Sequence, residues 1–427
     1  MSIPSVFFLH STNLPDERQG QYMHRVARPV ELLRADGRDF RVAEANWFAG
    51  GALDQALAVD ILILINLCTA EAKALIDLRR EAGRPTLLEI SDDPMAAMPW
   101  LKRDRPDPRT VAARLLQIAA KADGVQFSAE GLRARFGRLN RRTIVLPNIV
   151  DIPDTPPAPS PARDTFTIGW GGTRTHLADL RAIAPAIVDF CVSRDNVRFA
   201  LMGSADFLPM FAELPAERFR HHPFGTYADY TAFLRTLDVG LVPAMAGGFN
   251  DGRSDVKPVE LTMAGTAALI QSTPAYRHLE DLYPTFSTPE DLSAELARLA
   301  DDPPLRAEIV QRGFKQFAES RSGPALRLRW KEWLTSFAIA PGTAERFRPV
   351  DSSDLWDGVE LQHLRHADLA DKALLDRLQA LHADHPEHVQ TRWTLHQVAS
   401  STDRRQEAEA LTGALLAHPV YRRLLQP

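Results

Sequence analysis

Residues 246–265, AGGFNDGRSDVKPVELTMAG, combine a glycine-rich loop with basic side chains and one carboxylate. The loop lies between two apolar runs, so Arg253 and Lys257 are expected near the start of a helix that carries Glu260. Basic groups can offset the charge of a diphosphate, and a fixed carboxylate can accept hydrogen bonds from ribose hydroxyls. The segment therefore suits a nucleoside diphosphate. The alternative is an exposed helix with a Lys257–Glu260 pair, which is the better explanation if that pair is considered alone.

A second glycine cluster, IGWGGTRTHLADL, occupies residues 168–180 between an expected strand and an expected helix. Gly171 and Gly172 would let a ligand approach the backbone, and the start of the following helix favours an anion. The cluster is not a dinucleotide fingerprint, because a third glycine would be needed where Arg174 stands. We take Thr173 and Arg174, with the two glycines, as a candidate phosphate site. A tight turn without a ligand is the alternative.

Polar residues near the N-terminus are candidates for the acceptor side. The loop at residues 10–29 follows the first expected strand and contains Gly20, His24 and Arg25, together with Arg18. Each histidine there is more simply explained by a structural or exposed role. Asp92 follows another strand in EISDDP and could orient an acceptor hydroxyl, although an ordinary turn is the favoured explanation.

The elements that would position these residues alternate between short apolar runs and helical patterns. In residues 1–151 this alternation predicts parallel βαβ units, with strands at 5–10, 40–43, 59–66, 86–90, 124–127 and 143–146. A proline-rich linker follows at 152–164. The alternation restarts in 165–340, with strands expected at 167–170, 197–202, 239–242 and 268–271. The chain is thus predicted to be an α/β protein with two doubly wound parallel-sheet domains.

Residues 341–427 have helical periodicity and no β-type run, so a separate α-helical tail is expected. Two Ala-Leu…His-Pro patterns place Pro386 and Pro419 33 residues apart, and this spacing, with the position of Trp393, resembles one tetratricopeptide-type helix pair. A tetratricopeptide-like helix pair and an unrelated helical cap are equally compatible with this spacing.

Composition sets the broad class of the protein. The chain has 427 residues, 45% hydrophobic and 25% charged, with a net charge of −5, which argues against a broad nucleic-acid interface. Cys68 and Cys191 form neither a disulfide framework nor a zinc site. No signal peptide or transmembrane segment is evident, so a cytoplasmic protein is expected, and a peripheral position at the inner membrane face stays open.

The order of these motifs resembles the donor-site segment of family 4 retaining glycosyltransferases. The shared pattern falls on Phe249, Asn250, Arg253, Ser254, Asp255, Lys257, Glu260 and Gly265. Three further segments are similar to elements of the same family and occur in the same order, namely ADGVQFSAEGL (122–132), VLPNIVD (145–151) and GWGGTRTH (169–176). The resemblance covers residues 1–335.

This resemblance implies the GT-B fold, in which the first domain holds an acceptor and the second a nucleoside-diphosphate sugar. It implies transfer with retention of configuration, no essential metal or other cofactor, and a glycan, protein or lipid-linked acceptor. Arg253, Lys257 and Glu260 would be catalytic. Phe249, Asn250 and Ser254 would bind the donor together with the glycine cluster at 168–180, through Gly171, Gly172, Thr173 and Arg174. The nucleobase would lie near residues 221–230, although aromatic residues at such spacing are more often core. Helices after Pro303 are expected to cross back to the first domain, with Trp330 and Trp333 packing there.

One position departs from the family pattern. Many members carry a glutamate eight residues before Glu260, where this chain has Gly252. The departure keeps open a non-catalytic nucleotide-sugar-binding module whose helical tail recruits a protein partner. A GT-B nucleotide-sugar epimerase is a third hypothesis, but it would need an acid and a base across the cleft, and no strong His or Glu constellation identifies them.

Overall fold

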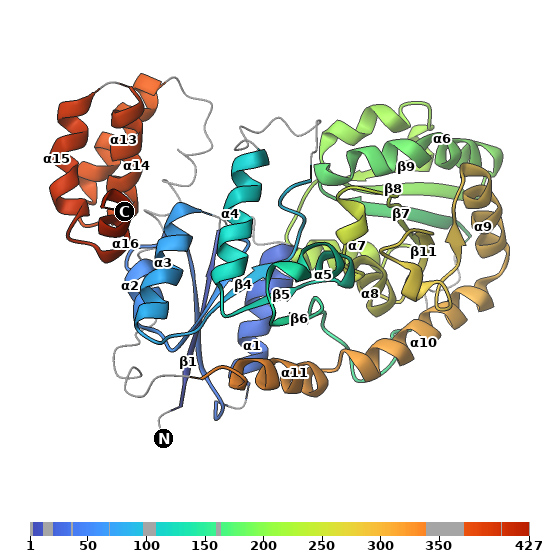
Figure 1. The fold of residues 1–427 in the computed structure, drawn as a ribbon. Helices are drawn as coiled ribbons and strands as arrows, with labels where there is room; N and C mark the ends of the chain where they lie inside the picture. The colour runs from blue at the N-terminus through green and yellow to red at the C-terminus, as the bar shows by residue number, and fades with distance from the viewer. Residues whose placement is uncertain are drawn as a thin grey trace.

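The computed structural model describes residues 3–11, 20–35, 37–67, 69–96, 108–158, 164–338, 371–402 and 404–426. Two α/β domains lie next to each other, and a helical bundle packs against the first (Figure 1). The predictions for Arg18, Cys68, linker residues 159–163 and tail residues 341–370 fall outside the described residues.

The first domain is built on six parallel strands in the order β2-β1-β3-β4-β5-β6. Strands such as β1 and β3 are buried along their whole length, as expected for apolar strands covered on both faces. The strands are β1 (Ser5–His10), β2 (Arg41–Asn46), β3 (Ile61–Ile65), β4 (Thr86–Ile90), β5 (Gly124–Phe127) and β6 (Thr143–Val145). The helices are η2 (Met23–Ala27), α1 (Arg28–Arg34), α2 (Ala52–Ala58), α3 (Ala70–Glu81), α4 (Pro108–Lys121), α5 (Glu130–Phe136) and η3 (Gly137–Leu139).

The second domain has six parallel strands in the order β12-β11-β10-β7-β8-β9. The chain order reverses between the neighbours β7 and β10, where doubly wound sheets bind ligands. The strands are β7 (Phe166–Gly172), β8 (Val197–Gly203), β9 (Phe219–His222), β10 (Val239–Val242), β11 (Ala267–Gln271) and β12 (Thr285–Phe286). The helices are η4 (Arg174–His176), α6 (Leu177–Ser193), η5 (Ala205–Phe211), η6 (Ala216–Arg218), α7 (Tyr227–Leu234), η7 (Asn250–Gly252), α8 (Val256–Met263), η8 (Arg277–Leu279), α9 (Pro289–Asp301) and α10 (Pro303–Ser320). The prediction of two doubly wound parallel-sheet domains is confirmed.

Helix α11 (Gly323–Thr335) returns to the first domain after α10, as expected, and runs along its lower side in Figure 1. Trp330 is fully buried beside Phe8, with ring centroids 5.8 Å apart. The Trp333 indole N–H donates to Gln126 Oε1 at 3.1 Å. A Cβ on Gly124 would lie 2.9 Å from the Trp333 ring, so this close approach of α11 to the sheet requires glycine there.

The tail contributes four described helices, α13 (Asp371–Asp384), α14 (Val389–Ser401), α15 (Arg405–Leu415) and α16 (Pro419–Leu425). They lie against α2 and α3 in Figure 1, and their apolar residues share one hydrophobic core with the first domain. Trp393 donates to Glu71 Oε1 at 2.8 Å, and Gln390 donates to the Trp47 carbonyl at 3.1 Å. The tail thus buries its apolar side against the rest of the chain.

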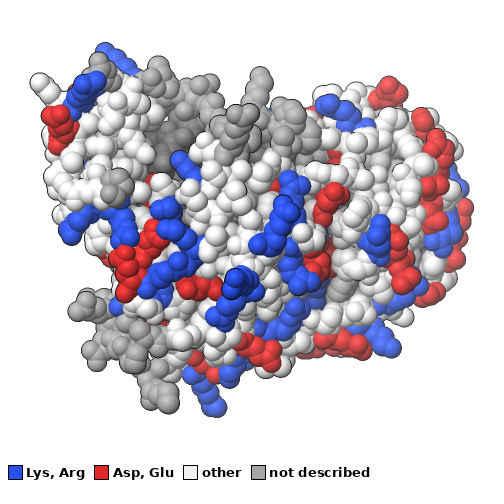
Figure 2. Space-filling view, in the orientation of Figure 1, with Lys and Arg blue, Asp and Glu red and all other residues white. Residues whose placement is uncertain are grey.

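Within the described ranges, no helix is both long and apolar enough to cross a membrane. The same ranges contain no group of three or more His, Cys, Asp or Glu residues able to hold a metal ion. Cys191 is buried, and burial raises the pKa of its thiol to about 12. Basic and acidic side chains are interspersed on the face shown in Figure 2.

Candidate active site

The two glycine-rich loops meet at the switch point of the second sheet. β7 ends in Gly171 and Gly172, while the loop after β10 leads through η7 into α8. Gly247 and Gly248 in that loop have φ values of 94° and 59°, a backbone conformation that glycine adopts readily. The sequence therefore positions both loops at the carboxyl edge of the same sheet, as predicted.

Lys257, in the first turn of α8, reaches over the glycine loop that follows β7. Its ammonium donates to the Gly171 carbonyl at 2.5 Å and lies 5.5 Å from the centre of the Trp170 ring. A Cβ on Gly172 would stand 3.2 Å from Lys257 Nζ and 2.7 Å from Trp170, so a side chain there would crowd both. Burial lowers the pKa of Lys257 to about 8. An anion at this turn would favour the charged form and raise this pKa.

Arg253 precedes α8 and is held by three groups. Its Nε donates to Asn250 Oδ1 at 2.8 Å, its Nη1 lies 2.6 Å from His176 Nε2, and its guanidinium sits 4.5 Å from the centre of the Phe249 ring. The other terminal nitrogen, Nη2, is buried and has no hydrogen-bond partner within the described part of the chain. A buried cationic donor without an acceptor is well suited to an anionic ligand.

His176 and Asp179, at the start of α6, complete the surroundings of Arg253. His176 Nδ1 lies 3.1 Å from Asp179 Oδ2, and Asp179 Oδ1 accepts from Asn250 Nδ2 at 2.6 Å and from the Met245 N–H at 3.0 Å. Burial, with Arg253 and Lys257 nearby, holds the pKa of His176 well below its usual value. The sequence analysis missed both residues, although an acid three residues after a histidine in HLAD was a readable helical-turn signal.

Glu260 is buried and connects the two domains. Its Oε1 accepts from the Tyr227 hydroxyl at 2.7 Å and lies 3.0 Å from His24 Nε2 of η2. Burial by itself would raise the pKa of Glu260, but His24, Tyr227 and Lys257 together lower it. The structure thus brings Glu260 and His24 together, although the sequence analysis placed them on the donor and acceptor sides respectively. A ribose would have to replace the His24 and Tyr227 contacts to reach this carboxylate.

The remaining donor-side residues divide between the domain interface and the rim. Ser254 accepts at its Oγ from Asn148 Nδ2 of the first domain at 2.8 Å. Arg174 is half-exposed and forms a 3.0 Å ion pair with Asp206, while the Thr173 and Thr175 hydroxyls are 2.7 Å apart. Arg174 and Thr173 therefore lie at the outer edge of the loop that follows β7 rather than beside Arg253.

The position of the absent family glutamate lies against the first domain. A Cβ on Gly252 would be 2.8 Å from the Leu132 side chain, and a Cβ on Gly131 would be 2.0 Å from the Asp251 carbonyl oxygen. η7 and α5 therefore pack backbone to backbone. A side chain at position 252 would require the buried Leu132 side chain to shift.

On the acceptor side, Arg25 and Gly20 have structural contacts. Arg25 makes a two-point ion pair with the buried Glu89, at 2.6 and 2.8 Å, and also donates to the Leu146 carbonyl at 2.7 Å. Gly20, with φ of 48°, accepts at its carbonyl from the His24 N–H at 3.0 Å and so begins the helical turn that carries His24. Arg25 positions β4 and the 146–148 segment, since its guanidinium is already engaged.

Asp92 lies beyond β4 and faces a polar group of side chains. Gln21 Nε2 is 2.7 Å from Ser91 Oγ and 3.4 Å from Asp92 Oδ2, and Asn66 Nδ2 donates to Ser91 Oγ at 2.6 Å. Asn66 has φ of 53°, a strained conformation of the kind found at functional sites. Asp92 is exposed at the surface, yet desolvation by the surrounding protein raises its pKa to about 6, while Arg253 and Arg25 act in the opposite direction.

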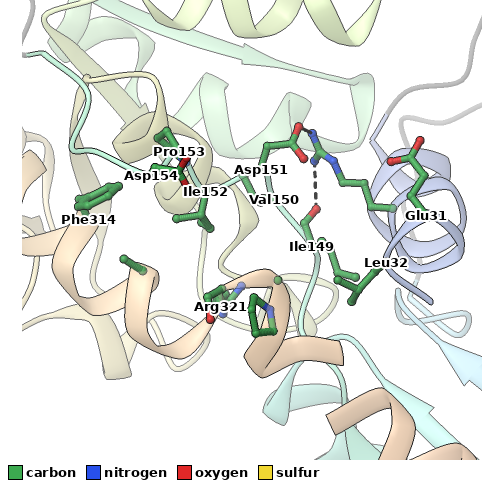
Figure 3. A pocket seen from close by; sticks show the side chains of 15 residues that line it. Glu31, Leu32, Ile149, Val150, Asp151, Ile152, Pro153, Asp154, Phe314 and Arg321 are labelled. Carbon is green, nitrogen blue, oxygen red and sulfur yellow. Dashed lines mark hydrogen bonds and ion pairs between the residues drawn. The ribbon is translucent and has the colours of Figure 1, made fainter. Parts of the chain in front are cut away.

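A cavity of about 520 Å³ lies between α1, the crossover at 149–154 and the turn between α10 and α11 (Figure 3). Arg28 borders it and bonds the Ile149 carbonyl at 3.0 Å and Asp151 Oδ2 at 2.5 Å. None of the donor-side residues discussed above lines this cavity. A cavity of only about 10 Å³ lies beside Trp170, Gly171 and Lys257, so side chains largely fill the space at that loop.

Comparisons with known proteins bear on the second domain and on the fold. Residues 181–334 match a family model described as glycosyl transferase-like, which spans most of the second domain. No curated protein matches the chain as a whole or in part.

Several solved structures share the fold. Sucrose-phosphate synthase from Thermosynechococcus elongatus has a TM-score of 0.58 at 12% identity, covering 78% of this chain and 98% of that one. A trehalose-6-phosphate structure from E. coli, bound with UDP-2-fluoro glucose, has a TM-score of 0.54 at 12% identity, covering 79% and 100%. TarM has a TM-score of 0.51 at 11% identity; the match covers 64% of this chain and 54% of TarM, so this chain spans about half of that protein's length. The fold is therefore that of GT-B glycosyltransferases.

The same fold also occurs in a different enzyme class. A putative UDP-N-acetylglucosamine 2-epimerase from Listeria monocytogenes has a TM-score of 0.52 at 13% identity, covering 78% of this chain and 96% of that one. Residue chemistry, rather than the fold, must separate the two activities.

Proposed function

We propose that this protein is a glycosyltransferase that moves a sugar from a nucleoside-diphosphate donor to an acceptor hydroxyl. The observation that carries the proposal is the convergence of Arg253, Lys257 and Glu260 at the switch point of the second sheet. Two half-buried cations there face the turn after β7, and a buried carboxylate, Glu260, lies one helical turn beyond Lys257. The glycosyl transferase-like match over 181–334 supports this class of chemistry over the epimerase alternative.

On the donor side, Lys257 and Arg253 would bind the diphosphate and stabilise its charge as the sugar departs. Such preorganised cations in a water-poor site can replace a metal ion in that role. Glu260 would accept hydrogen bonds from the ribose once the domains separate enough to release His24. On the basis of the family resemblance, we propose that the transfer retains the anomeric configuration of the sugar.

On the acceptor side, Asp92 would orient the hydroxyl that attacks the sugar. It lies at the carboxyl end of β4, and its pKa of about 6 makes its carboxylate a usable base near neutral pH. Gln21, Ser91 and the strained Asn66 would hold the acceptor around it.

Thermal unfolding in the presence of UDP, GDP, TDP and CMP tests the donor assignment. A ligand that binds only the folded protein stabilises it by about 2.7 kcal/mol at one hundred times its Kd. We expect one nucleoside diphosphate to raise Tm, and Lys257→Ala and Glu260→Ala to reduce that shift without abolishing folding. Unchanged nucleotide binding and sugar transfer in both variants would show that the site is assigned wrongly.

Incubation with the matching nucleotide sugar separates the reaction classes. Without an acceptor, an epimerase would convert the sugar, whereas a transferase would release only a little free nucleotide by transfer to water. Formation of an epimer would contradict the transferase proposal. If the protein bound the nucleotide sugar but transferred no sugar to any acceptor tested, a non-catalytic module would be favoured. The anomeric configuration of the product, read by NMR, tests retention by itself.

A further inference from the structure

Arg253 and three neighbouring polar side chains form a closed ring of hydrogen bonds. Asp179 Oδ1 accepts from Asn250 Nδ2 at 2.6 Å, and Asn250 Oδ1 accepts from Arg253 Nε at 2.8 Å. Arg253 Nη1 meets His176 Nε2 at 2.6 Å, and His176 Nδ1 returns to Asp179 Oδ2 at 3.1 Å. The ring joins the start of α6 to the loop after β10, which are the two walls of the switch point.

The partners around the ring fix the proton on His176. Arg253 is a permanent donor, so His176 Nε2 must act as an acceptor. The single imidazole proton of His176 then lies on Nδ1, where Asp179 Oδ2 accepts the hydrogen bond. A neutral histidine of this tautomer holds the guanidinium without competing for an anion.

The ring leaves one donor without a protein partner. Asn250 uses both ends of its amide within the ring or with the Met245 carbonyl, and Asp179 uses both oxygens. Arg253 Nη2 is buried and unpartnered within the described residues. The guanidinium is planar, so fixing Nε and Nη1 also fixes the direction of Nη2.

We propose that Asp179 and His176 are positioning residues that fix Arg253 so that its free Nη2 binds the diphosphate of the donor. This inference rests on the proposed function, because it names what that site recognises. It assigns the discrimination between a nucleoside diphosphate and the bare nucleoside to a side-chain ring that contacts the ligand only through Arg253.

Paired variants of His176 test the acceptor role. His176→Leu removes the acceptor at Nε2, whereas His176→Gln can supply a carbonyl oxygen in its place. We expect His176→Leu to weaken UDP, GDP or TDP binding at least about tenfold, the cost of misplacing one charge-assisted hydrogen bond. His176→Gln should retain most of the affinity. Titration calorimetry with each diphosphate and with uridine, guanosine or thymidine should show an unchanged affinity for the nucleoside.

Asp179→Asn separates positioning from simple electrostatics. Removing a negative charge near a phosphate site should by itself strengthen the binding of an anion. In contrast, an amide nitrogen facing His176 Nδ1 would move the ring proton to Nε2, where it would repel Arg253. We therefore expect Asp179→Asn to weaken diphosphate binding, and a stronger or unchanged affinity would overturn the proposal.

A double-mutant cycle tests whether His176 acts through Arg253. Arg253→Lys should weaken diphosphate binding in the wild-type background but add little to His176→Leu. Additive losses, or equal losses for the diphosphate and the nucleoside, would mean that the ring is only a structural tie. If the wild-type protein bound none of the diphosphates, both this inference and the proposed function would fail. Wild-type binding with a tolerant His176→Leu would refute the inference alone.

Discussion

At the residue scale, Lys257 makes nucleotide binding dependent on pH. Burial lowers its pKa to about 8, so the ammonium is charged below that pH and neutral above it. Affinity for UDP, GDP or TDP should therefore fall as the pH rises from 8 to 9.5, by up to about tenfold per pH unit for one proton. Lys257→Arg, which stays charged, should remove this dependence when titrated by calorimetry. A flat profile for the wild-type protein would place Lys257 outside the diphosphate site.

The pKa of Asp92 leads us to expect that turnover increases with pH, in contrast to nucleotide affinity. Its pKa of about 6 means that the carboxylate becomes available as the pH rises through that value. Release of nucleotide from the accepted nucleotide sugar should therefore increase between pH 5 and 7, and Asp92→Asn should be slow and lack this rise. Asp93 is the neighbouring control, because its carboxylate is already engaged by the Met95 N–H and by an ion pair with Arg135 at 3.0 Å. An Asp93→Asn variant that lost the pH dependence while Asp92→Asn kept it would reverse the assignment.

The residue types that could bind a diphosphate were readable from sequence, but their partners were not. Spacing placed Arg253, Lys257 and Glu260 on one loop and helix because helical periodicity is local. His176 and Asp179 join Arg253 only because β7 and β10 are neighbours in the sheet. Likewise, the Glu260–His24 contact depends on how two domains meet, which a local pattern does not encode.

At the scale of elements, the contact between α5 and η7 depends on two glycines. A Cβ at position 131 would lie 2.0 Å from the Asp251 carbonyl oxygen, which cannot rotate away. Gly131→Ala should therefore lower the free energy of unfolding by about 1–3 kcal/mol, despite alanine's higher helix propensity. Gly413→Ala in α15 is the matched control, because a Cβ there meets nothing within 4 Å. Denaturant unfolding should show the control neutral or stabilised; a stabilised Gly131→Ala would mean that the domains do not hold this contact in solution.

Elements with long buried runs were predicted well, and short or partly exposed ones were missed. β9 alternates little between buried and exposed residues, and β12 has only two residues, so neither stands out as a strand. Helix α8 begins at Val256, so Lys257 lies at its start as expected, and Pro258 is tolerated in the first turn. The strands β1, β3, β7 and β10, which position the site, were all predicted because apolar runs bounded by turn residues are a strong local signal.

At the scale of the whole molecule, α11 and the helical tail both return to the first domain, and this packing decides which of its surfaces are covered. The family resemblance implied that α11 would return to the first domain, with Trp330 and Trp333 packing there, and both tryptophans are buried in that domain. It did not indicate that the tail would share the first domain's core, because Leu375, Leu378 and Tyr421 have ordinary helical spacing. A protein partner of the tail would thus meet the side that faces away from the first domain.

This packing predicts that the tail is required for stability of the first domain but not for nucleotide binding by the second. Trp393 is buried and donates to the buried Glu71, so Trp393→Ala would remove a large apolar side chain and leave a carboxylate unpaired. We expect it to lower the free energy of unfolding by about 3–5 kcal/mol, whereas Leu328→Ala, at a 56% exposed position, should cost little. Guanidinium unfolding measures the loss, and titration of the matching nucleoside diphosphate below the transition should give a wild-type Kd. If the tail were an independent module, its core would not be continuous with that of α3. The Trp393→Ala variant would then show a separate unfolding transition for the tail, and the main transition would be unchanged.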